Sequence, residues 1–156
     1  MFDVIVLMVG FLIGYLYYIK YRTSVGGVIA TPFLVIYVIR VPEIILSTGL
    51  AISLGLIALE IAHDRFLLYG RRAFYIAAFV SMIVFLATYN YVDIDARAVS
   101  AFTSLIGGII AYNMHKEIVT NGDYLKPILV WIAEFITITV ISIAIYFILV
   151  SPSLGG

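Results

Sequence analysis

The sequence predicts an all-α, polytopic integral membrane protein with about six hydrophobic segments. Of its 156 residues, 64% are hydrophobic and 12% are charged, whereas a soluble domain has roughly 25% charged residues. A chain of this composition cannot cover a surface that faces water. Residues 1–156 are therefore expected to form a single transmembrane domain in the cell membrane, in contact with lipid. The formal net charge is zero, so no field attracts nucleic acid and no such partner is expected.

Three apolar segments, at residues 4–18, 24–39 and 44–61, occupy the first half of the chain. The first segment is uncharged and leads into a run of tyrosines and basic residues, which is typical of an interfacial anchor. Its Gly10 and Gly14 have the GxxxG spacing that permits close helix packing, and we expect them to pack within their own chain.

The segment at 24–39 is short and contains Gly26, Gly27 and Pro32. Its 16 residues would span roughly 24 Å as a helix, less than the hydrocarbon core of about 30 Å. Proline removes a backbone donor and clashes with the preceding turn, so a regular helix is not expected throughout this segment. Pro42 suits a helix start and is expected to open the next segment.

The second half has the same number of apolar segments, at residues 73–89, 98–114 and 128–150. The segment at 98–114 is again short and again contains a glycine pair. Between it and the last segment, residues 115–126 are expected to form a loop. Asn121-Gly122-Asp123 is a turn signal within that loop.

The two halves, about residues 1–70 and 71–156, contain similar runs, VGGVIA at 25–30 and IGGIIA at 106–111. Three crossings in each half predict a 3+3 inverted repeat, in which short segments interrupted by Gly or Pro mark a site near the membrane midplane. The residues of that predicted site are Gly26, Gly27, Pro32, Gly107 and Gly108. Two alternatives stay open: the similarity arises by chance in a chain rich in small and apolar residues, or the glycines only permit tight helix packing.

Lysine and arginine are distributed unevenly between the two ends of the predicted segments. If all six segments cross the membrane, one side has seven of these residues and the other side has only Arg40 and Arg97. The seven are Lys20, Arg22, Arg65, Arg71, Arg72, Lys116 and Lys126. The positive-inside rule then places the seven in the cytoplasm and both termini outside. If the segments at 24–39 and 98–114 are re-entrant, six lysines and arginines lie on one side of the membrane and three on the other. This distribution is less uneven, so six crossings fit the positive-inside rule better.

Three stretches of the chain carry a family resemblance. Residues 68–72 read LYGRR and are followed by Phe74. Residues 108–111 read GIIA with Lys116 downstream, and residues 23–34 contain both glycine and proline. With the chain length and the order of segments, these stretches resemble the poly-γ-glutamate biosynthesis membrane protein family, PgsC or CapC, over most of the chain.

The resemblance implies a non-catalytic membrane subunit of a complex that makes and exports poly-γ-glutamate, an anionic capsule-type polymer. In such a complex the subunit works with an ATP-dependent amide ligase and with a membrane-anchored accessory subunit. No catalytic residue is carried over from the family, no cofactor is expected, and the chain is not expected to be an enzyme by itself.

The predicted binding residues for the polyanion or the partner are Tyr69, Gly70, Arg71, Arg72 and Lys116. An arginine guanidinium is permanently charged and holds a carboxylate through two parallel hydrogen bonds, so it suits a polymer of carboxylates. The alternative is that these cations only anchor the topology, and for Arg71 and Arg72 both interpretations stay open.

Glu60 and Glu134 are the predicted intramembrane acidic residues. Carboxylates inside a membrane are costly and are functional-site candidates by default, and a basic partner at the cytoplasmic end is expected to reach Glu134. The structural alternative is that each pairs with an arginine and holds the bundle together. His63 and His115 lack the paired spacing of a metal site, so we expect interfacial residues rather than metal ligands.

Two other functions remain open. The inverted-repeat pattern favours a free-standing small membrane transporter or channel. The GxxxG spacing and the small-residue stripes are equally compatible with an oligomerisation scaffold, so a homo-oligomer is also possible.

The uneven charge distribution predicts that both termini are extracytoplasmic and that Arg71 is cytoplasmic. The chain has no native cysteine, so Arg71→Cys and Gly156→Cys each provide one labelling site. An impermeant maleimide added to intact cells should label Cys at position 156 but not at position 71. Labelling of both sites from the same side would contradict the six-crossing topology.

Overall fold

The computed structural model describes residues 2–23, 27–67 and 70–150, and this part of the chain is built from helices and their connecting turns. The expected all-α class with six hydrophobic segments is thereby confirmed. The helices are α1 (Phe2–Tyr21), α2 (Gly27–Arg40), α3 (Ile44–Phe66), α4 (Arg71–Thr88), α5 (Arg97–Asn121) and α6 (Leu125–Val150), and the short 3₁₀ turns η1 (Tyr89–Tyr91) and η2 (Ile94–Ala96) lie between α4 and α5.

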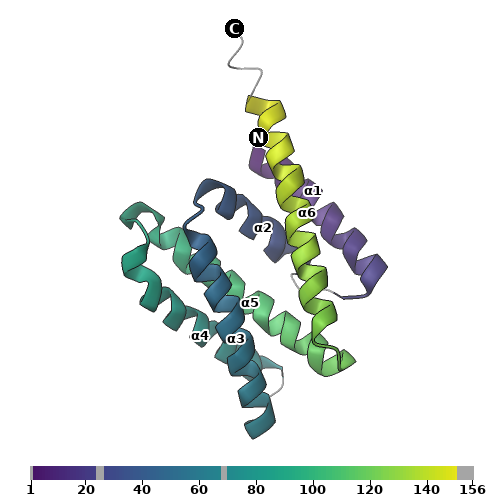
Figure 1. Cartoon of the computed structure of the whole chain (residues 1–156), viewed down its shortest axis with the longest axis vertical. Helices are drawn as coiled ribbons and strands as arrows, with labels where there is room; N and C mark the ends of the chain where they lie inside the picture. Colours follow the sequence, from purple (N-terminus) through teal and green to yellow (C-terminus); the bar gives the residue numbers. More distant parts are fainter. Residues whose placement is uncertain (1, 24–26, 68–69, 151–156) are drawn as a thin grey trace.

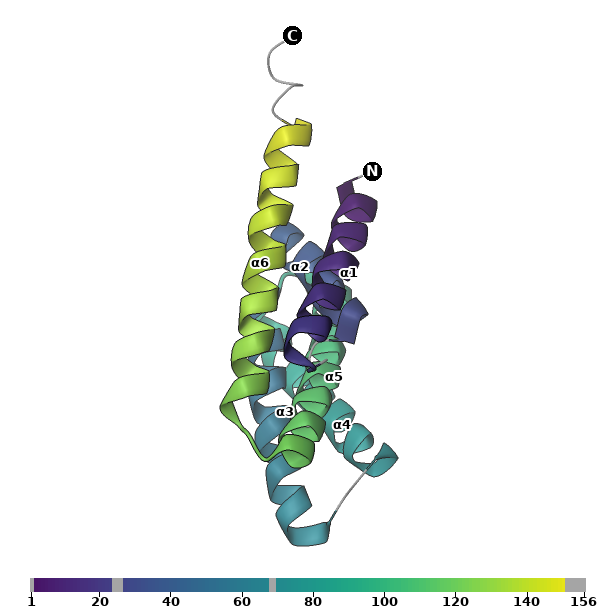
Figure 2. The ribbon, with the colours of Figure 1, turned by 90° about the vertical axis from the view of Figure 1, so that its right-hand side faces the viewer.

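The helices form two groups that lie side by side (Figure 1). α3, α4 and α5 pack on one another, and α6 packs on α1 and α2. All helices except α2 are long and apolar enough to cross a membrane, and α2 is a shorter apolar helix. The start of α1 and the end of α6 lie at the same end of the bundle (Figure 2). There the rings of Phe2 and Tyr146 meet edge to face, with centroids 5.7 Å apart.

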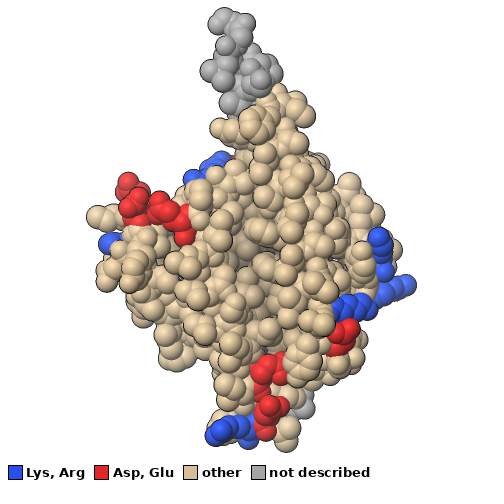
Figure 3. All heavy atoms as spheres, viewed as in Figure 1, with Lys and Arg blue, Asp and Glu red and all other residues tan. Residues whose placement is uncertain are grey.

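The outer surface of the bundle is apolar along its helices. Met8 of α1, Phe79 of α4 and Phe147 of α6 are each about two-thirds exposed, at 68%, 68% and 65%. Charged side chains gather in two groups on the face drawn in Figure 3, with an uncharged band between them. An apolar band between two charged ends is what a lipid bilayer requires of an integral membrane protein.

The expectation that a regular helix cannot run through Pro32 is wrong, because α2 is helical from Gly27 to Arg40. Pro32 is fully buried, and its ring lies against Gly10 of α1, where an added Cβ would fall 2.6 Å from the proline Cβ. This packing of the ring on α1 offsets the missing backbone donor. It also shows that Gly10 packs within its own chain, as expected.

The fifth segment is longer than expected. α5 continues for seven residues beyond Met114, so residues 115–121 are helical rather than part of a loop. The helix ends at Gly122, which has a left-handed φ of 69° and donates its N–H to the carbonyl of Ile118 at 2.7 Å. The turn predicted at this glycine is confirmed, whereas the predicted short segment at 98–114 is not.

The glycine pair of α5 lies where this helix fits between α3 and α4, and the helix is uninterrupted there. A Cβ on Gly107 would lie 3.0 Å from the Thr48 carbonyl oxygen of α3. A Cβ on Gly108 would lie 2.9 Å from the Ala77 carbonyl oxygen of α4 and would overlap the Ser81 hydroxyl. The pair therefore permits close backbone approach on two sides, which is the packing interpretation of the glycine runs.

Gly108→Ala is expected to destabilise the protein, because the new methyl group collides with backbone as well as with Ser81. The cost should be about 1–3 kcal/mol, as for other overpacked cores, which lowers the melting temperature by about 2–4 °C for each kcal/mol. The matched control is Gly49→Ala in α3, where an added Cβ meets nothing within 4 Å. Thermal unfolding in detergent measures both, and equal melting temperatures would contradict the packing role of Gly108.

Candidate functional site

The turn between α3 and α4 places two arginines on the surface. α3 ends at Phe66 and is capped by Leu67, which has a left-handed φ of 47°. Gly70 then precedes α4 with φ 60° and ψ −128°, a conformation that only glycine adopts readily. Arg71 and Arg72 follow as the first residues of α4, and both are exposed. Neither arginine forms an ion pair with another described residue.

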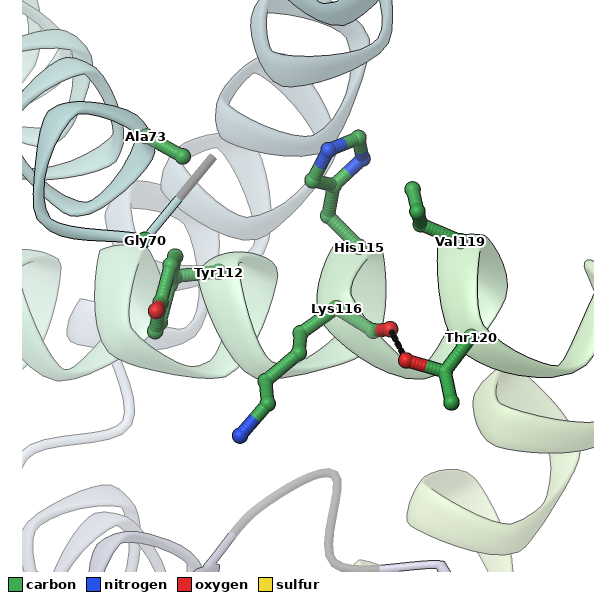
Figure 4. Close-up of a pocket in the computed structure, with 7 residues that line it drawn as sticks. All are labelled: Gly70, Ala73, Tyr112, His115, Lys116, Val119 and Thr120. Carbon is green, nitrogen blue, oxygen red and sulfur yellow. Dashed lines mark hydrogen bonds between the residues drawn. The ribbon is translucent and has the colours of Figure 1, made fainter. Parts of the chain in front are cut away.

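A cavity of about 210 Å³ lies beside this turn (Figure 4). Its lining residues are Gly70, Ala73, Tyr112, His115, Lys116, Val119 and Thr120. The structure thus brings together Gly70 and Lys116, two of the predicted binding residues, although they are distant in sequence. Lys116 itself is exposed, and its ammonium group extends away from α5. The site therefore combines a small, mostly apolar hollow with an exposed cation at its edge.

A polar cluster that includes the cavity-lining His115 links α3, α5 and the turn before α6. The Nδ1 atom of His115 lies 3.0 Å from Oε1 of Glu60, and its N–H donates because an ionised carboxylate can only accept. The Tyr124 hydroxyl donates to Oε2 of the same carboxylate at 3.4 Å. The His63 ring meets His115 edge to face, with centroids 5.3 Å apart. Glu60 therefore joins three parts of the chain through a histidine and a tyrosine rather than through an arginine.

The negative charge of Glu60 raises the pKa of Tyr124 above its ordinary value, since a second negative charge nearby is unfavourable. Asp64 acts in the same direction and is the smallest of the causes.

Sequence reasoning missed this cluster, because it treated His63 and His115 as separate interfacial residues. Glu60 and His63 share one face of α3 at a spacing of three residues, and this was the available signal. The partner on α5 is 55 residues from Glu60, and no local pattern points to it. Among the described residues, no group of three acidic, histidine or cysteine side chains is arranged to hold a metal ion.

The other acidic candidate, Glu134, lies on α6 with only 6% of the residue exposed. No ion pair with a basic residue was found for it within the described ranges. The basic partner that the sequence suggested is therefore not seen, and Oε1 of Glu134 has no hydrogen-bond partner in the described structure.

The remaining predicted residues either pack at contacts between helices or lie outside the described part of the chain. Pro32, Gly107 and Gly108 are buried at helix contacts, as described above, and Gly27 is the first residue of α2. Gly26 and Tyr69 lie outside the described residues.

The cations at the opposite end of the bundle are held by neighbours. Arg40 at the end of α2 forms an ion pair with Asp3 of α1 at 2.5 Å. Arg97 at the start of α5 donates to the Tyr89 hydroxyl at 3.1 Å and lies 4.0 Å from the centre of that ring. The exposed cations near the cavity therefore differ from these two in having no such partner among the described residues.

Comparison with known proteins gives one family. The model of the family described as capsule biosynthesis CapC matches residues 9–122 of the chain. The match contains Gly70, Arg71, Arg72 and Lys116 and ends at Gly122, before α6. Neither a curated protein nor a solved structure matches the chain.

Glu60→Gln should lower the pKa of Tyr124 toward its ordinary value, because the substitution removes the charge that is the main cause of the shift. The glutamine oxygen still accepts from His115, so the shape of the cluster is kept. Nuclear magnetic resonance of carbon-13-labelled tyrosine follows the titration, and Tyr124→Phe identifies the signal. Asp64→Asn should give a smaller decrease, and an unchanged Tyr124 pKa in Glu60→Gln would contradict the arrangement.

Proposed function

Because the chain belongs to the capsule biosynthesis CapC family, we propose that it is a non-catalytic membrane subunit of a complex that makes and exports an anionic capsule polymer of the poly-γ-glutamate type. The family match over residues 9–122 is the observation that carries this proposal. The apolar helices suit a subunit that resides in the membrane.

The cations beside the cavity have no ion-pair partner among the described residues, and this supports an anionic ligand. Arg71 and Arg72 are exposed on the first turn of α4, and Lys116 lies across the cavity on α5. A polymer with one carboxylate in each repeat unit offers successive acceptors to such donors, and guanidinium groups hold carboxylates through paired hydrogen bonds. In this proposal, the end of the bundle that contains the turn at Gly70 contacts the growing polymer or the subunit that delivers it.

The partners of this subunit are those that supply the steps it does not perform itself. Formation of an amide bond from a free carboxylate requires activation, and we assign that step to an ATP-dependent amide ligase that docks at the cationic end. A membrane-anchored accessory subunit completes the complex. The membrane subunit then holds the ligase at the bilayer and positions the polymer for export.

The double variant Arg71→Lys/Arg72→Lys tests the role of the guanidinium groups. Lysine keeps the positive charge, so membrane insertion and protein level should be unchanged. Polymer formation or ligase co-purification should fall on the order of tenfold, because losing a charge-assisted hydrogen bond costs about 1.5 kcal/mol or more. The defect should deepen with added salt if the contact is mainly electrostatic.

The matched control is Arg65→Lys, an exposed arginine in the last turn of α3 near the same end. It should behave like the parent in both assays. A double lysine variant with normal polymer formation and normal ligase binding would leave Arg71 and Arg72 as topology signals only. A native pull-down in which no ligase accompanies the parent protein would argue against the complex itself.

A further inference from the structure

Glu134 is a carboxyl group inside a membrane-spanning helix that the fold does not account for. It is 6% exposed, and Oε1 has no hydrogen-bond partner in the described structure. A charge buried without a partner is strongly destabilising. Ionisable residues within membrane spans are rare for this reason, and those that persist usually have a function.

A second unpartnered oxygen lies beside this carboxyl. Thr31 of α2 is fully buried, and it is the side chain that faces Glu134 across the contact between α2 and α6. The hydroxyl is near enough to interact with the carboxyl, but Oγ1 forms no hydrogen bond of normal geometry with any described residue. Two buried oxygens on packed helices, neither with a hydrogen bond of normal geometry, call for a further group that satisfies them, such as a water, a proton or an ion.

No ion pair to Glu134 is formed from α1, α2 or α5 among the described residues, and several of their titratable side chains have other contacts. Tyr17 of α1 forms a hydrogen bond with Thr137, Tyr37 of α2 meets the Phe102 ring edge to face, Arg40 of α2 pairs with Asp3, and His115 of α5 forms a hydrogen bond with Glu60. Lys116 of α5 and Lys126 of α6 are exposed at the end of the bundle. The described part of the chain therefore offers Glu134 no counter-charge of its own.

We propose that Glu134 and Thr31 form a binding site for a small monovalent cation between α2 and α6. The carboxylate supplies the negative charge, and the threonine hydroxyl supplies a second oxygen, as hard cations prefer. A proton satisfies the site when the carboxylic acid donates to Thr31 Oγ1, and an alkali-metal ion satisfies it by bridging the two oxygens. The site lies apart from the cationic end, and α6 lies beyond the family match, so the proposal does not depend on the polymer or on the ligase.

Thermal unfolding of the purified full chain in detergent tests the site. A cation that binds only the folded state raises the melting temperature, and an empty ionised site lowers it. The parent and Glu134→Gln are compared over a range of pH in sodium, potassium and choline chloride at constant ionic strength. The parent should lose a few degrees as pH rises in choline chloride, and the glutamine variant should not show this loss.

The salts identify the cation. If the occupant is a proton, the loss at high pH is the same in all three salts. If it is an alkali-metal ion, sodium or potassium chloride restores the melting temperature of the parent at high pH, and choline chloride does not. The melting temperature of Thr31→Val should depend on pH and salt differently from that of the parent. Thr31→Ser should behave like the parent, because serine retains the hydroxyl.

The proposal is overturned if the melting temperatures of the parent and of Glu134→Gln depend in the same way on pH and salt. If the glutamine variant does not fold, the comparison of Thr31→Val with Thr31→Ser decides, since both keep Glu134. Identical profiles for these two threonine variants would then exclude the site.

Discussion

The structure depends on the close contact that α5 makes with α3 and α4 at its glycine pair. Lipid tails are as apolar as leucine, so apolar burial alone does little to hold transmembrane helices together, and close van der Waals contact has to do so. Gly107 brings α5 against the backbone of α3, and Gly108 brings it against α4. Lys116 lies further along the same helix, so this contact also sets its distance from Gly70 across the cavity.

The cations at one end of the bundle have side-chain partners, whereas those at the candidate site are exposed and have none among the described residues. At one end, Arg40 and Arg97 are engaged by Asp3 and Tyr89 and so help to join helices. At the other end, the cations of the α4 start have no partner among the described residues and are exposed. An exposed guanidinium keeps its donors available to an external carboxylate.

The contact of α6 with α1 and α2 also contains buried polar side chains. The Tyr17 hydroxyl lies 2.9 Å from the Thr137 hydroxyl, which links α1 to α6. Oε1 of Glu134 and Oγ1 of Thr31 lie between α6 and α2 without a hydrogen bond of normal geometry among the described residues. Polar groups in a membrane bundle form hydrogen bonds with one another, with water or with ions. A bound ion would therefore stabilise the contact between α6 and α2.

The sequence alone determined the class of the protein, the number of its segments, the start of α3 and the turn at Gly122, because composition and local backbone preference set these features. It also identified the arginines beside Gly70, whereas the inverted repeat it suggested remains a prediction. Only the tertiary structure decided that α2 stays helical through Pro32, that α5 runs on to Asn121, and that His115 meets Glu60. The first and the last of these outcomes depend on contacts between helices: a proline ring on a glycine of α1, and a histidine on a carboxylate 55 residues away. A local pattern describes which face of a helix is polar or small, but it does not say which other helix will cover that face.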